Sequence, residues 1–166
     1  MFYYLNIFLV CSVLGYVIET LLKTFVFHGM NNGILFGPWI PVYGFGAVII
    51  ILIERLIFNR LKAPRIVKII LMFISVTLLL TLLEFLGGIL IEFLFDKVFW
   101  DYSNLKFNFG HYIALEISLL WGIFSLIFIY VIKPIEDKFI KKIPKWVSIL
   151  VFSIFIIDVI LTCLLV

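Results

Sequence analysis

Charged side chains are scarce in this sequence. Of its 166 residues only 14% are Asp, Glu, Lys or Arg, whereas 65% are hydrophobic, and the mean hydropathy is +1.28. A soluble domain averages about 45–50% apolar residues. The composition therefore excludes a large soluble domain and predicts an all-α fold, a polytopic transmembrane helical bundle that forms a single domain over residues 1–166. A net charge of only +3 gives no indication of nucleic-acid binding.

Cysteine and histidine are equally rare. Cys11 and Cys163 both lie in apolar runs, which favours buried thiols over a disulfide or a metal pair. His28 and His111 lack the spacing of paired metal ligands, so we expect no metal site and no cofactor. The N-terminus has neither a basic region nor a small-residue cleavage site, which predicts a retained first span.

Motifs for hydrolysis and nucleotide binding are missing. The sequence contains no P-loop, no nucleophile elbow, no HExxH and no dinucleotide-binding glycine pattern. An enzyme is therefore the less favoured interpretation, and any ATP-driven activity requires a separate ATPase subunit.

Long apolar runs dominate what is present, and each is long enough to cross a bilayer core of about 30 Å. The third run is longer than a single crossing needs, so a kink or break at Gly87-Gly88 is an open alternative. The five predicted spans are Phe2–Phe27, Pro41–Phe58, Ile66–Phe95, Tyr112–Ile132 and Val147–Val166.

Basic residues gather in the linkers 55–68 and 133–145. By the positive-inside rule these linkers and the N-terminus face the cytoplasm. The C-terminus and the loops 28–41 and 96–111 are then external, in the plasma membrane of a cell. The linkers also suit contact with anionic lipids or docking of a cytoplasmic subunit.

The stretch from Asn31 to Gly46 combines helix-breaking residues with apolar ones. It is expected to be a tucked-in outer loop whose backbone groups are hidden in protein or in a wet cavity. Trp39 and Tyr43 would form one wall of a site there. The residues expected to shape the loop are Gly37, Pro38, Pro41, Gly44 and Gly46.

Acidic residues interrupt the apolar runs, where a charge is costly and indicates function. The predicted topology places Glu19, Glu84, Glu92 and Glu116 in the outer halves of three spans. We expect them to meet in one hollow beneath the two outer loops. The alternatives are an internal Glu19–Lys23 ion pair, a hydrogen-bonded structural Glu84, and solvated carboxylates for Glu92 and Glu116.

Three further features of the sequence are consistent with purely structural roles. Asp158 would hydrogen-bond a neighbouring helix, and Glu54-Arg55 would anchor a span at the interface. The aromatic residues around Asp101 suit an interfacial belt or a cation site. The predicted substrate-binding residues are Glu19, Glu84, Glu92, Glu116, Asp101, Trp39, Tyr43, Trp100 and Tyr102.

The sequence resembles the CmpB-like family of small bacterial integral membrane proteins, which are named as ABC-transporter permeases. The segments that carry the resemblance are LGYVIE at 14–19, NGILFGP at 32–38, PVYGFG at 41–46, LEF at 83–85, WDYS at 100–103, Asn108 with Gly110, and WG at 121–122. The resemblance implies a polytopic membrane protein of the bacterial inner membrane with a transport function. Family members often have Arg where this chain has Asn32, so a cationic role is not expected there.

Three functions remain open at this point. The favoured one is a transporter component whose carboxylates bind a cationic or proton-coupled ligand, with the loop 37–46 gating entry. The second is an intramembrane enzyme acting on a lipid or lipid-linked substrate, with Tyr43 or His111 assisting paired acids. The third is a non-catalytic partner or assembly factor. The expected partners are membrane lipids, further copies of the chain, and a separate ATPase or other cytoplasmic subunit that contacts the basic linkers.

Overall fold

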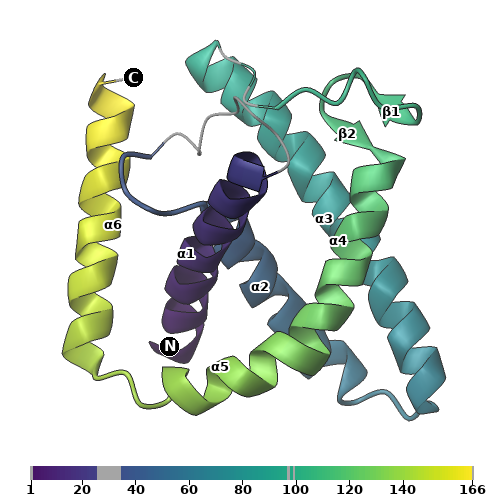
Figure 1. Cartoon of the computed structure of the whole chain (residues 1–166). Helices are drawn as coiled ribbons and strands as arrows, with labels where there is room; N and C mark the ends of the chain where they lie inside the picture. The colour runs from purple at the N-terminus through teal and green to yellow at the C-terminus, as the bar shows by residue number, and fades with distance from the viewer. Residues whose placement is uncertain (1, 26–34, 97, 99, 166) are drawn as a thin grey trace. The chain divides into compact units, whose positions relative to one another are not determined.

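A computed structural model describes residues 2–25, 35–96, 98 and 100–165. Nearly all the regular structure is helical (Figure 1). The elements before the second predicted loop are α1 (Phe2–Phe25), α2 (Pro41–Ile53), the π-helical turn η1 (Glu54–Phe58) and α3 (Arg65–Phe95). The elements after it are β1 (Asn108–Phe109), β2 (Ile113–Ala114), α4 (Leu115–Ile127), the π-helical turn η2 (Phe128–Ile132), α5 (Lys133–Ile140) and α6 (Lys145–Leu165).

Within the described residues, five helices are long and apolar enough to cross a membrane, which confirms the predicted all-α transmembrane fold. Their spanning segments are Phe2–Leu21, Pro41–Phe58, Arg65–Leu94, Leu115–Ile140 and Lys145–Leu165. Helix α3 runs without interruption through Gly87 and Gly88, so the third span is not broken.

The start and end of the fourth span differ from the prediction. Tyr112 precedes the helix instead of beginning it, because Ile113 and Ala114 pair with β1 as a short antiparallel strand. Helical structure then continues past Ile132 as far as Ile140. The N-terminal part of the predicted linker 133–145 is therefore the amphipathic helix α5, and only 141–144 connects it to α6.

Prolines mark two of the helix starts. Pro41 is the first residue of α2, a position where the missing N–H costs nothing. Pro64 lies directly before α3 with ψ 150°. The predicted loop from Asn31 to Gly46 is therefore too long at its C-terminal end, since Gly44 and Gly46 are helical. His28 and Asn32 lie outside the described residues.

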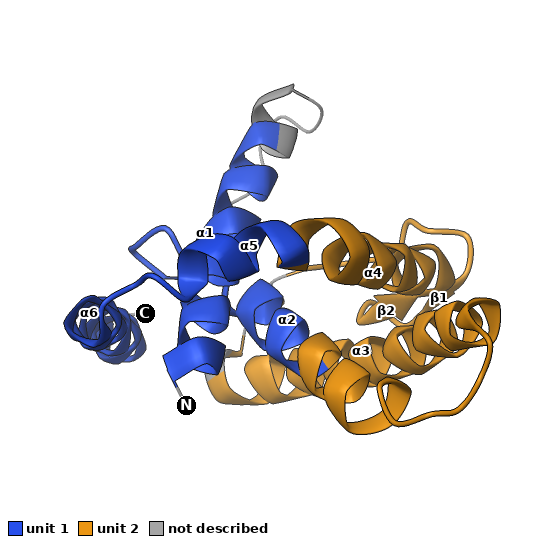
Figure 2. Cartoon of the chain, turned by 90° about the horizontal axis from the view of Figure 1, so that it is seen from below, with its two compact units in different colours: residues 1–49, 134–166 blue, residues 50–133 orange. Residues whose placement is uncertain are grey.

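The internal contacts of the chain divide it into two units, coloured separately in Figure 2. Unit 1 comprises residues 1–49 and 134–166, and unit 2 comprises residues 50–133. The single domain over residues 1–166 stays a prediction.

Unit 1 is held together by aromatic packing and by close approach of α1 and α2. Phe8, Trp39 and Phe155 form a buried cluster with edge-to-face ring contacts at centroid distances of 5.2 and 5.9 Å. A methyl group on Gly44 would lie 2.3 Å from Ser12 Oγ and 2.5 Å from the Phe8 carbonyl oxygen. Only glycine lets α2 pack this closely on α1.

Unit 2 is built on α3 packed against α4. A methyl group on Gly122 would lie 2.2 Å from Thr77 Oγ1, so this glycine sets the closest approach. Lys133 Nζ and Glu54 Oε2 form an ion pair of 2.9 Å. Glu54 is therefore ion-paired, and a role for Glu54-Arg55 as an interfacial anchor stays a prediction. The outward side chains of α3 are apolar, with Leu78 67% and Phe93 83% exposed, as lipid contact requires.

Candidate functional site on helix α3

Glu84, Gly88 and Glu92 lie on one face of α3, as their spacing predicts. The axial rise from Glu84 to Glu92 is about 12 Å, too long for the two carboxylates to share a proton. Each carboxylate instead meets side chains from the hairpin segment 100–112 or from α4. We call these two glutamates and their partners the α3 site.

Glu84 is held by two neutral donors. The Tyr102 hydroxyl donates to Oε1 at 2.9 Å, and the Trp121 indole N–H donates to Oε2 at 3.2 Å. Among the described residues no lysine, arginine or histidine forms an ion pair with it. The structure thus brings together two predicted site residues, Glu84 and Tyr102, and adds Trp121.

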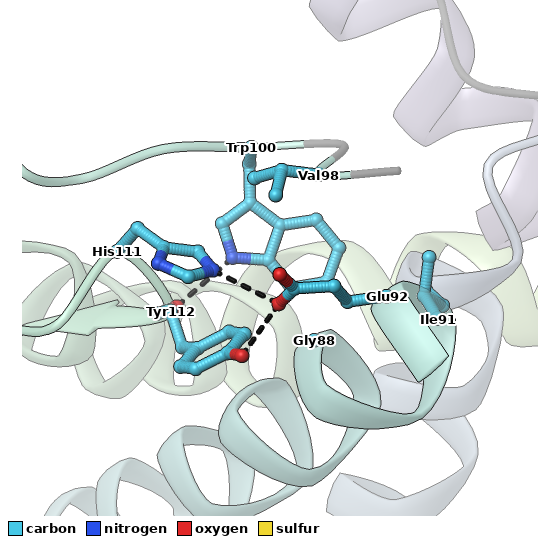
Figure 3. Close-up of a pocket in the computed structure, with 7 residues that line it drawn as sticks. All are labelled: Gly88, Ile91, Glu92, Val98, Trp100, His111 and Tyr112. Atoms are coloured by element: carbon cyan, nitrogen blue, oxygen red, sulfur yellow. Dashed lines mark hydrogen bonds and ion pairs between the residues drawn. The ribbon is translucent and has the colours of Figure 1, made fainter. Parts of the chain in front are cut away.

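Glu92 is bound by the end of the hairpin (Figure 3). Its Oε2 accepts the Tyr112 hydroxyl at 2.5 Å and lies 3.1 Å from His111 Nε2. The Trp100 indole N–H donates to the Tyr112 carbonyl oxygen at 2.9 Å. The hydrogen bond from the Tyr112 hydroxyl to Glu92 raises the pKa of Tyr112, because only the neutral hydroxyl can donate.

A small hollow opens beside these groups. It has room for roughly one water molecule. Gly88 forms part of its wall, where a methyl group would meet the Tyr112 ring at 2.7 Å and the Trp100 ring at 3.2 Å. The residues that line it are Gly88, Ile91, Glu92, Val98, Trp100, His111 and Tyr112 (Figure 3).

Asp101 and Glu116 support the segment before β2. Asp101 Oδ1 accepts the Ser103 hydroxyl and the Ser103 backbone N–H, and these bonds hold the pKa of Asp101 below its ordinary value. Glu116 Oε1 accepts the Phe107 N–H at 3.2 Å. Both carboxylates therefore have a structural role in the turn, and a binding role for them stays a prediction.

Glu19 belongs to unit 1 and lies beside the predicted wall of the loop. The Tyr43 hydroxyl donates to Glu19 Oε1 at 3.1 Å. The Tyr43 ring lies against Gly15, where a methyl group would sit only 2.3 Å from Cδ2. A hollow shared between Glu19 and the glutamates of unit 2 stays a prediction, and the side chain of Lys23 is outside the described residues.

The sequence missed the partner of Asp158. It predicted a bond to a neighbouring helix, whereas Asp158 of α6 binds the loop before α2. Oδ1 accepts the Phe36 N–H at 3.1 Å, and Oδ2 accepts both the Gly37 N–H and the Trp39 indole N–H at 2.8 Å. Two features of the sequence pointed to this contact: an acid within an apolar run, and a loop whose N–H groups required acceptors.

A row of hydroxyl groups was also missed. Thr77 and Thr81 precede Glu84 on the same face of α3 by the three-and-four spacing. Buried Ser118 and Ser125 occupy α4, and Gly122 between them contacts Thr77. The buried hydroxyl oxygens of Thr77 and Thr81 have no hydrogen-bond partner among the described residues. Ser118 and Ser125 instead donate to the carbonyl oxygens of Ala114 and Gly122. In the described part of the chain no group of three or more His, Cys, Asp or Glu is placed to hold a metal ion.

Comparison with known proteins identifies a family. No curated protein and no solved structure matches the chain. The model of the CmpB family, whose description reads "Putative ABC-transporter type IV", matches residues 6–163. That range includes every residue of the α3 site and both basic linkers. With five membrane-spanning helices and a match over nearly its whole length, the chain belongs to this family of ABC-transporter-type membrane proteins.

Proposed function

We propose that this chain is the membrane-embedded component of a transporter, in which Glu84 and Glu92 bind a proton or a small cation. The observation that carries the proposal is the environment of Glu84. A carboxylate within a membrane span is costly unless it is paired or functional. Glu84 has two neutral donors and, among the described residues, no ion-pair partner.

The size of the hollow beside Glu92 supports a small ligand. Space for roughly one water molecule suits a proton carried on water or a small cation. Glu92, His111 and Tyr112 are three groups that exchange protons, and they are in direct contact. A proton arriving there has both an acceptor and a donor within reach.

The hydroxyl groups of the α3–α4 interface would extend the route beyond Glu84. Thr77 and Thr81 lie on the face of α3 that carries Glu84, and their buried hydroxyl oxygens have no hydrogen-bond partner among the described residues. Each hydroxyl can donate and accept a hydrogen bond, so it can relay a proton or solvate a cation.

The wider arrangement follows from the predicted topology. The site would open to the outer face of a bacterial plasma membrane, with the linkers 55–68 and 133–145 in the cytoplasm. An ATP-driven cycle would use a separate ATPase, since the chain has no nucleotide-binding motif, and a five-span chain suits assembly into an oligomer.

The test compares Glu84→Gln with Asp96→Asn in proteoliposomes. Asp96 is an exposed carboxylate directly after α3, so its variant is a matched control. Proton flux is followed with a trapped pH-sensitive dye, and cation flux with isotopic tracers. We expect at least a tenfold loss for Glu84→Gln and near wild-type flux for Asp96→Asn. Full activity in a correctly folded Glu84→Gln protein would refute the proposal.

A second candidate is an intramembrane enzyme, and one observation favours it. Glu92 and His111 form an acid–base pair beside the Tyr112 hydroxyl. Such a pair could move protons during cleavage of a lipid-linked substrate. Lipid turnover by the purified protein that disappears in His111→Gln would favour this candidate over transport.

A further inference from the structure

Helix α5 has two chemically different faces, and its acidic residues all lie on the inner one. Glu136 and Ile140 are buried, at 7% and 3% exposure. The Tyr3 hydroxyl donates to Asp137 Oδ1 at 2.8 Å, and the Cys11 thiol lies 3.5 Å from Glu136 Oε1. These contacts attach α5 to α1, both within unit 1.

The exposed surface formed by the end of α5, the turn after it and the start of α6 is basic and apolar. Lys138, Lys141 and Lys142 are exposed beside Phe139, which is 64% exposed. Trp146, in the first turn of α6, is 67% exposed. We call these five residues the α5 face. No carboxylate between 134 and 146 is exposed, so the charge of this face is wholly positive.

The α5 face is tied to a membrane span. Helix α6 begins at Lys145, only three residues after Lys142. Three residues reach at most about 10 Å, which is close to the Debye length at physiological ionic strength. Lys141 and Lys142 therefore lie within electrostatic range of the bilayer surface from which α6 enters.

We propose that the α5 face binds the phosphate headgroups of anionic lipids at the surface of the chain's own membrane. The lysine ammonium groups would contact the phosphates, while the rings of Phe139 and Trp146 insert at the level of the headgroups. A soluble acidic protein is the less suitable occupant. The rings of Phe139 and Trp146 are exposed close to the bilayer, which offers them an apolar environment. A soluble partner would have to provide such an environment itself.

The experiment measures lipid selectivity of the full-length protein in vesicles. Spin-labelled anionic and zwitterionic lipids are compared by the fraction immobilised at the protein surface. The test variant is Lys138→Gln with Lys141→Gln and Lys142→Gln. The matched control replaces the same three lysines by arginine, which keeps the charge. All three lysines are exposed, so both variants should fold, and thermal unfolding checks this.

We expect the wild type and the arginine variant to prefer the anionic lipid, and the glutamine variant to lose that preference. About fivefold in affinity for each lysine gives roughly a hundredfold loss in total. An unchanged preference in the glutamine variant would overturn the proposal. If the glutamine variant kept its lipid preference but no longer captured a soluble acidic protein, the proposal would also fail. The α5 face would then be a protein-docking surface. If the triple variant fails to fold, Lys138→Gln and Lys142→Gln are measured singly, with a fivefold loss expected for each. Glu84→Gln should leave lipid selectivity intact, which separates this test from that of the proposed function.

Discussion

The Asp158 carboxylate of α6 accepts the indole N–H of Trp39 at 2.8 Å, although the two residues are 119 positions apart in the sequence. The same carboxylate accepts the backbone N–H groups of Phe36 and Gly37. A loop that cannot satisfy these donors within itself is thus fixed by one acid from a membrane span. Trp39 is in turn packed edge-to-face on Phe155, one helical turn before Asp158.

Replacing Asp158 should release this loop. In Asp158→Ala three donors lose their acceptor, and a buried unpaired donor costs about 1–3 kcal/mol. We expect the free energy of unfolding to fall by about 2–5 kcal/mol. Thermal unfolding in detergent and protease cleavage near residue 36 measure the effect.

Trp39→Phe is the matched variant for this loop. It removes the indole N–H and part of the buried ring volume but keeps an aromatic ring near Phe155, so the loss should be about 1–3 kcal/mol. Equal stability of Asp158→Ala and the wild type would show that the loop does not depend on this carboxylate.

The glycines of the helices should differ sharply in their tolerance of alanine. A methyl group on Gly44 meets the Phe8 carbonyl oxygen at 2.5 Å, so α2 would have to move away from α1. We expect Gly44→Ala to lower the free energy of unfolding by about 1–3 kcal/mol. A methyl group on Gly87 meets nothing within 4 Å, so Gly87→Ala should be neutral or stabilising by up to about 1 kcal/mol. Thermal unfolding of the two variants checks both signs, and a Gly87→Ala protein that is the less stable of the two would contradict the packing argument.

The turn at Asp101 should be sensitive to acid. The Ser103 hydroxyl and N–H hold the pKa of Asp101 below its ordinary value of about 3.9. Because the pKa of Asp101 is lowered in the folded state, the bonds to Ser103 stabilise the turn fully above the ordinary pKa of this carboxyl. This stabilisation is lost as the pH falls through the folded value. The hydrogen-exchange protection factors of the segment 100–112 should therefore fall below about pH 4.

Ser103→Ala provides the control for this pH dependence. The variant loses the hydroxyl donor, so the pKa of Asp101 moves back towards its ordinary value. The acid-induced change should then begin at higher pH and be smaller. Identical exchange profiles for the variant and the wild type would rule out this bond as the cause.

Hydropathy along the chain was sufficient to find the five spans, because a membrane requires about twenty consecutive apolar residues in each helix. The same argument identified the intramembrane acids, since a charge is conspicuous in such a run. It did not find the strands Asn108–Phe109 and Ile113–Ala114, which are too short for any alternation to be visible. Helix α5 as a whole was missed for a related reason: its charged residues suggested a linker, although they belong to an amphipathic helix.

The sequence alone therefore determined the class of fold, the family segments and the identity of the acids. Only the tertiary structure decided what each acid binds. Glu84 takes its donors from Tyr102 and Trp121, 18 and 37 residues away, and Asp158 takes its donors from a loop more than a hundred residues earlier. These pairings depend on how closely helices approach at positions such as Gly44, Gly88 and Gly122. Local hydropathy is a property of one segment, whereas helix packing depends on the shapes of two surfaces at once.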